Sequence, residues 1–142
     1  MQTDFTKVKP YNDNEAKTPQ LSKMFNTISS KYDQFNDIMS WGMARVWRKN
    51  ALSSLKAYNP KQILDIATGT GDICIKAFQY LQPEHVTGVD ISDQMMEVGR
   101  EKVEKAGLSA KINFEIQDCA SLTYPDNSFD AVTISFGIRN FE

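Results

Sequence analysis

The chain has 142 residues, 41% of them hydrophobic, enough for one globular domain with its own core. No apolar run approaches the roughly 20 residues of a membrane span, and the polar N-terminus does not read as a signal peptide, so a cytoplasmic protein is expected. Cys74 and Cys119 are far apart and His85 is the single histidine, which argues against a disulfide framework and against a transition-metal site.

The net charge of −2 conceals an asymmetry along the chain. Residues 1–60 carry nine basic against five acidic residues, and residues 61–142 carry seven against thirteen. Because a basic segment precedes an acidic one, no nucleic-acid footprint over the whole chain is expected.

The N-terminal third is predicted to be helical after a flexible tail at residues 1–17. Apolar residues recur at helical spacing between Pro19 and Ser30, and again from Met43 to Leu55. Asn59 and Pro60 then end the second helix. Residues 18–59 are therefore interpreted as a helical cap.

Strands and helices alternate over residues 60–142, which form the expected α/β domain. The predicted order is strand 61–66, helix 71–81, strand 85–90, helix 93–106, strand 111–116 and strand 129–134. Such alternation predicts a parallel sheet flanked by helices, with right-handed crossovers.

A glycine-rich turn follows the first predicted strand. Gly69 and Gly71 allow positive φ and close approach of a ligand to the backbone, and Asp65 and Asp72 lie on either side of the turn. The next strand ends in Asp90, which can accept both hydroxyls of a ribose. These are the elements of a nucleoside pocket.

Charge indicates which nucleoside would bind. A dinucleotide fingerprint would have glycine where Cys74 stands, and Asp72 at the helix start would repel a diphosphate. A carboxylate there suits a ligand with a sulfonium and an α-amino group, such as S-adenosylmethionine. The plainer alternative is that Asp72 caps a helix and Asp65 begins a turn.

Several segments resemble a known family. The 65–72 turn, Asp90, and the segments 117–120 and 129–132 resemble successive motifs of class I S-adenosylmethionine-dependent methyltransferases. The segments 30–47 and 133–140 resemble, more narrowly, the ubiquinone/menaquinone biosynthesis C-methyltransferases of the UbiE or MenG type. Phe35 and Ala44 depart from that pattern, and Ala44 stands where the family usually has a histidine. The family continues beyond the equivalent of Glu142, so the chain is expected to be the first part of a larger domain.

The resemblance implies a Rossmann-like fold and roles for the residues of the turn. Gly69, Thr70 and Gly71 would pass beneath the methionine part of the cofactor. Asp65 would face its α-amino group through water, and Asp90 would hold the ribose.

Residues further along would surround the adenine. Asp118 would accept the exocyclic N–H, the backbone amide of Cys119 would donate to the ring, and Met95 or Ile91 would supply an apolar wall. Ser135 would close the pocket near the transferring methyl. The plainer alternatives are a loop cap for Asp118, core packing for Met95 and turn chemistry for Ser135.

The implied reaction is C-methylation of a demethylated polyprenyl quinol, with Tyr32, Asp33 and Arg139 as polar candidates on the substrate side. Peripheral membrane contact and self-association through the exposed fourth strand are also expected. The alternatives are a methyltransferase with another small acceptor, a nucleotide-binding or dimerisation module without activity, and a nicotinamide dehydrogenase.

Overall fold

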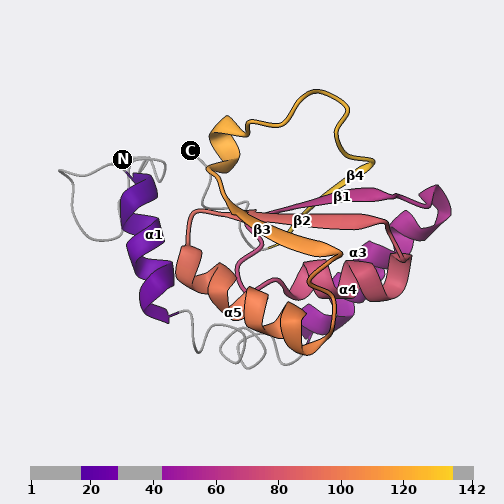
Figure 1. Ribbon diagram of the computed structural model, residues 1–142, viewed down its shortest axis with the longest axis horizontal. Coiled ribbons are helices and arrows are strands. Elements are labelled where there is room, and N and C mark those ends of the chain that lie inside the picture. The colour runs from indigo at the N-terminus through magenta and orange to yellow at the C-terminus, as the bar shows by residue number, and fades with distance from the viewer. Residues whose placement is uncertain (1–16, 29–42, 136–142) are drawn as a thin grey trace, which may run out of the picture.

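The computed structural model describes residues 17–28 and 43–135 (Figure 1). The α-helices are α1 (Lys17–Ile28), α3 (Met43–Leu55), α4 (Asp72–Leu81) and α5 (Asp93–Lys105). The strands are β1 (Gln62–Ile66), β2 (His85–Asp90), β3 (Ile112–Ile116) and β4 (Ala131–Ile134), and two short 3₁₀ helices are η3 (Lys56–Tyr58) and η4 (Cys119–Ser121). Within the described ranges, no helix combines the length and the apolar character needed to cross a bilayer.

The four strands form one parallel sheet in the order β3-β2-β1-β4. The predicted parallel sheet is confirmed, and β4 lies beside β1. Ile63 pairs with Ala131 and with Val86, so β1 lies in the centre of the sheet.

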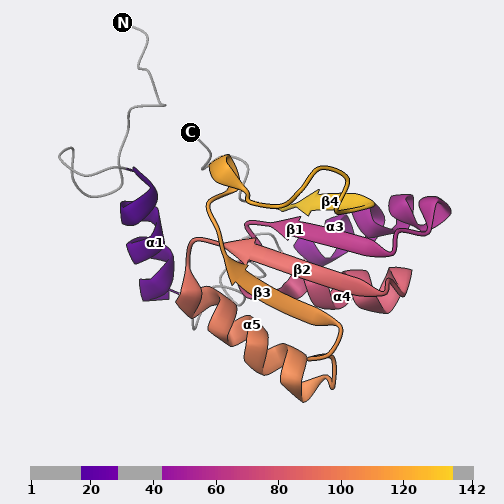
Figure 2. The same cartoon turned by 45° about the horizontal axis from the view of Figure 1, so that its top comes forward.

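Helices α3, α4 and α5 cover one face of the sheet, as Figures 1 and 2 show. Strand residues at alternate positions point into this layer and pack on the apolar sides of the helices. The core consists of Leu52, Ile63, Cys74, Ala77, Leu81, Val86, Val103 and Ile112. Helix α1 packs against α5 at the edge of the layer.

Several element boundaries differ from the prediction by one or two residues. Strand β4 begins at Ala131 rather than at residue 129. The preceding residue, Asp130, binds the start of β1 through its side chain, because its Oδ2 accepts the backbone N–H groups of Lys61 and Gln62, each at 2.8 Å. Helix α1, predicted from Pro19, already includes Lys17, and its predicted end at Ser30 lies outside the described residues.

The other face carries a polar network on β2 and β3. The His85 ring and the Thr87 hydroxyl both hydrogen-bond to Asn113 Oδ1, and Asn113 donates to Glu115. Tyr124 then donates to Glu115 at 2.7 Å, which fastens the segment after β3 over this face. The single histidine therefore has a structural contact, away from the glycine turn.

Candidate functional site

The predicted polar site residues lie at one edge of the sheet. Asp65 is the fourth residue of β1, Asp90 ends β2, Asp118 follows β3 and Ser135 follows β4. Since the strands are parallel, their carboxyl ends meet at this edge, where open α/β sheets bind ligands.

The glycine turn is fastened to Asp90. Gly69 and Gly71 have φ of +56° and +76°, in the left-handed region that favours glycine. The Gly69 N–H donates to Asp90 Oδ2 at 2.8 Å, and the Ser92 N–H donates to Oδ1 at 3.0 Å. Burial raises the pKa of Asp90, while these two N–H groups oppose the shift. Each carboxylate oxygen keeps a lone pair for a further donor.

Asp65 is only 1% exposed and lies next to Thr68 and Cys74, on either side of the glycine turn. Thr133 Oγ1 donates to its Oδ1 at 2.6 Å, and Cys74 Sγ lies 3.7 Å from Oδ2. Burial raises the pKa of Asp65 to about 6, although hydrogen bonds from Thr133, Thr68 and Cys74 partly offset this. The carboxyl group can therefore change its ionisation near neutral pH.

The partners of Asp65 were not anticipated from the sequence. Thr133 is its neighbour in the pairing of β1 with β4, so only the register of these two strands brings the residues together. Gly88 is its neighbour on β2, and a Cβ there would lie 2.8 Å from Thr68 Oγ1. Gly88 thus leaves room for Thr68, which in turn contacts Cys74 at 3.2 Å.

The role expected for Asp72 needs correction. Arg48 donates to its Oδ2 at 3.1 Å and Lys102 donates to its Oδ1 at 3.0 Å, so two cations compensate its charge. It is not the helix cap either, because the N-cap of α4 is Gly71 and no side chain caps it. Of the three acids around the turn, Asp65 and Asp90 therefore remain to attract a cationic ligand.

The residues expected around adenine have partners of their own. Asp118 Oδ1 accepts the Ala120 N–H at 3.0 Å and caps η4, which is the plainer interpretation, and Cys119 follows it partly exposed. Met95 is 2% exposed and packs close to Gly69, whereas Ile91 remains partly exposed. Gln117 N–H donates to the Asp90 carbonyl, which brings the two strand ends together.

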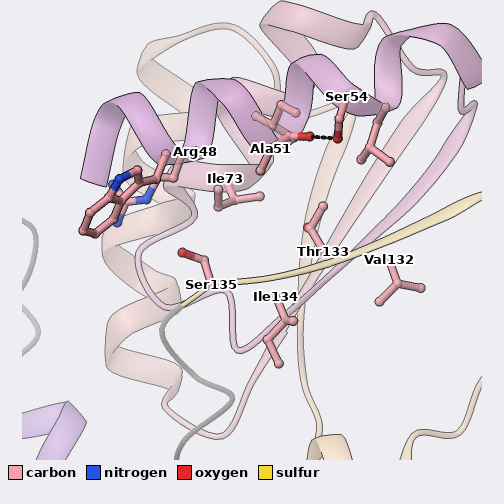
Figure 3. A pocket seen from close by; sticks show the side chains of 11 residues that line it. Arg48, Ala51, Ser54, Ile73, Val132, Thr133, Ile134 and Ser135 are labelled. Atoms are coloured by element: carbon pink, nitrogen blue, oxygen red, sulfur yellow. Dashed lines mark hydrogen bonds between the residues drawn. The ribbon is translucent and has the colours of Figure 1, made fainter. Parts of the chain in front are cut away.

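Ser135 lies beside a hollow of about 500 Å³ between α3 and β4 (Figure 3). Thr133 and Ser135 point toward α3, and Val132 and Ile134 point away from it. Trp47, Arg48 and Ile73 line the hollow on the helical side.

Tyr32, Asp33 and Arg139, the candidates on the substrate side, lie outside the described residues. Within the part of the chain that the structure describes, no group of three or more His, Cys, Asp or Glu residues is placed to hold a metal ion.

The fold and the site define a class of protein: a Rossmann-like domain of the class I methyltransferase type. A family model described as the ubiE/COQ5 methyltransferase family matches residues 12–142, and the chain belongs to this family.

Similar proteins agree with this assignment. The chain is 54% identical to the demethylmenaquinone methyltransferase of Bacteroides fragilis over 96% of its own length and 56% of that protein. It is 38% identical to the ubiquinone/menaquinone biosynthesis C-methyltransferase UbiE of Geotalea daltonii, over 87% of the chain and 53% of the relative. Among solved structures, the DhpI–SAH complex matches with a TM-score of 0.62 and 25% identity, over 82% of this chain and 52% of that one. The chain spans about half the length of these curated relatives.

Proposed function

We propose that the protein containing this chain transfers a methyl group from S-adenosylmethionine to a ring carbon of a demethylated polyprenyl quinol, demethylmenaquinol or its ubiquinol-pathway equivalent. Family membership and the names of the relatives support the reaction. The main support for S-adenosylmethionine as the cofactor is the hydrogen bond between the glycine turn and the acid at the end of β2, which the Gly69 N–H donates to Asp90 Oδ2 at 2.8 Å.

The charges at the carboxyl edge fit this cofactor. Asp90 keeps acceptor capacity for the two ribose hydroxyls, beside the two N–H groups that it already binds. Asp65 is buried, so its effect on a cationic amino group would pass through a bridging water, and Thr70 would bond the polar end of the methionine part. A solved structural neighbour is a complex with SAH, in agreement with this assignment.

Adenine would lie beyond Asp90, against the segment after β3. Asp118 would accept the exocyclic N–H, and Cys119 would offer its backbone N–H. Ile91 is favoured over Met95 as the apolar wall, because Ile91 is partly exposed whereas Met95 is buried against the turn.

When bound, S-adenosylmethionine supplies a methyl group on a sulfonium that is already an activated leaving group. The protein then has to orient donor and acceptor, which can contribute about 7–11 kcal/mol. Ser135 would close the pocket near the methyl group. A base that ionises the quinol hydroxyl would make the adjacent carbon nucleophilic, and Tyr32, Asp33 and Arg139 are the candidates for assisting it.

The lipophilic acceptor motivates a peripheral location at the inner membrane face, with the protein in the cytoplasm. Helix α3 supports this, because Met43, Val46 and Trp47 are 45–53% exposed and Arg45 and Lys49 are exposed beside them. Each basic residue near an anionic surface would add about 1 kcal/mol. Equal partitioning of the intact protein onto anionic and neutral vesicles at low salt would refute the electrostatic part.

The proposed division of the chain is a helical cap at 18–59 and an α/β unit at 60–142. The outer edge of β4 supports self-association of these 142 residues. Within the described sheet β4 is terminal, and Val132 and Ile134 are 56% and 37% exposed. Such an edge can pair with another chain. Sedimentation of the 142-residue chain as a stable monomer would contradict this.

The reaction is tested with the intact protein, methyl-labelled S-adenosylmethionine and a demethylmenaquinol with a short prenyl tail. We expect one labelled methyl group on the quinol ring carbon. Label on the quinol oxygen, or label only when a sterol or simple phenol replaces the quinol, would refute the proposed acceptor.

A further inference from the structure

Helix α5 presents one face to the glycine turn, from Met95 to Lys102. Met95, Gly99 and Lys102 are spaced four and three residues apart, so they lie on the same side of the helix. A Cβ on Gly69 would lie 3.1 Å from Met95 Cε, and a Cβ on Gly99 would lie 3.1 Å from the Thr70 carbonyl oxygen. The turn therefore packs directly against α5, and the missing side chain of Gly99 leaves room for the Thr70 backbone.

Lys102 completes this face with a charged contact. Its Nζ donates to Thr70 Oγ1 at 3.1 Å and to Asp72 Oδ1 at 3.0 Å. It thus links a residue between the two glycines to the first residue of α4. Arg48 of α3 holds the other oxygen of Asp72 at 3.1 Å, so three helices meet at this carboxylate.

We propose that Lys102 is a positioning residue that holds the Gly69–Thr70–Gly71 turn in its cofactor-binding conformation through Thr70 and Asp72. The role rests on the proposed function, because it concerns how the turn receives S-adenosylmethionine. Lys102 would not touch the reacting atoms. It would lower the conformational cost of binding by fixing the turn beforehand.

An ordinary surface ion pair predicts a different result. The side chains of Lys102 and Asp72 are 29% and 30% exposed, and a pair of that kind alone would add a little stability without affecting ligand affinity. The additional contact with Thr70 is what connects Lys102 to the binding turn, so cofactor affinity distinguishes the two roles.

The test is calorimetric titration of the intact protein with S-adenosylhomocysteine. Lys102→Met keeps the length of the side chain and removes its charge, and it should raise Kd by about three- to tenfold, as expected for a partly exposed charged contact. Lys105→Met removes an exposed lysine from the same helix and should leave Kd unchanged, while Lys102→Arg should restore most of the affinity. In turnover, KM for S-adenosylmethionine should rise and KM for the quinol should stay constant.

Asp72→Asn tests the same link without altering Lys102, should that variant fold poorly, and it should raise Kd in the same direction. Wild-type Kd in Lys102→Met or in Asp72→Asn, or an equal loss in Lys105→Met, would overturn the role of Lys102. Absence of binding by the unmodified protein would instead overturn the proposed function, and this role with it.

Discussion

Replacing Asp65 by asparagine should stabilise the fold while weakening cofactor binding. Asp65 is 1% exposed, and burial raises its pKa from 3.8 to about 6. Because the protonated form is favoured in the folded state, the cost of ionisation builds up as the pH rises from about 4 to 6 and is complete above that range. A shift of this size corresponds to about 3 kcal/mol at pH 8 and roughly 1.5 kcal/mol at pH 5.

Asparagine removes this cost but introduces a smaller one. Its Oδ1 can still accept from Thr133, whereas its NH₂ group would face the Cys74 thiol with a mismatch of about 1 kcal/mol. We therefore expect Asp65→Asn to raise the free energy of unfolding by about 2 kcal/mol at pH 8 and by about 0.5 kcal/mol at pH 5.

Urea denaturation of wild type and variant at both pH values measures these differences. Asp126→Asn, at an exposed carboxylate, is the control and should show the same small effect at pH 5 and pH 8. If Asp65→Asn raised the free energy of unfolding equally at the two pH values, ionisation of the buried carboxyl group would not be what destabilises the wild-type protein. If the variant bound S-adenosylhomocysteine as tightly as wild type, Asp65 would have no part in recognising the cofactor.

Three further predictions concern the same edge of the sheet. Asp90→Ala should weaken S-adenosylhomocysteine binding by about 1.5–3 kcal/mol in a calorimetric titration, since it removes a charged acceptor for the ribose, and an unchanged affinity would refute that assignment. Gly71→Ala should lower the free energy of unfolding by about 2–4 kcal/mol, because φ is +76° and the new Cβ would lie 2.6 Å from Phe114 Cζ. The control Gly107→Ala, with φ of +69° and no atom within 4 Å of the new Cβ, should lower the free energy of unfolding by only about 1 kcal/mol. Equal losses of stability for the two variants in urea denaturation would contradict the role of the Phe114 contact. Finally, affinity for S-adenosylhomocysteine should fall from pH 8 to pH 5 as Asp65 (pKa about 6) protonates, and an equal fall in Asp65→Asn would count against this cause.

The sequence was sufficient to predict the sheet and the main residues at its edge. Strong apolar runs located the strands, and the glycine turn with Asp90 indicated where the candidate binding site lies. These features are local, because periodicity and turn chemistry depend on neighbouring residues. The acids meet because parallel strands place their carboxyl ends together, which topology alone determines.

The charge compensation of Asp72 could not be predicted in this way. Arg48 lies 24 residues before it and Lys102 lies 30 residues after it, and only the packing of α3, α4 and α5 brings these side chains together. The contact of Thr133 with Asp65 depends similarly on strand register. Long-range pairings of this kind leave no signal in residue spacing.

We propose above all that the carboxyl ends of these parallel strands bind the nucleoside of S-adenosylmethionine through Asp90. Calorimetric titration of the intact protein with S-adenosylhomocysteine and, separately, with NAD tests it directly. We expect one S-adenosylhomocysteine per chain, a strong loss of affinity in Asp90→Ala, and no binding of NAD. Saturable binding of NAD that competes with S-adenosylhomocysteine, or S-adenosylhomocysteine binding unaffected by Asp90→Ala, would contradict it.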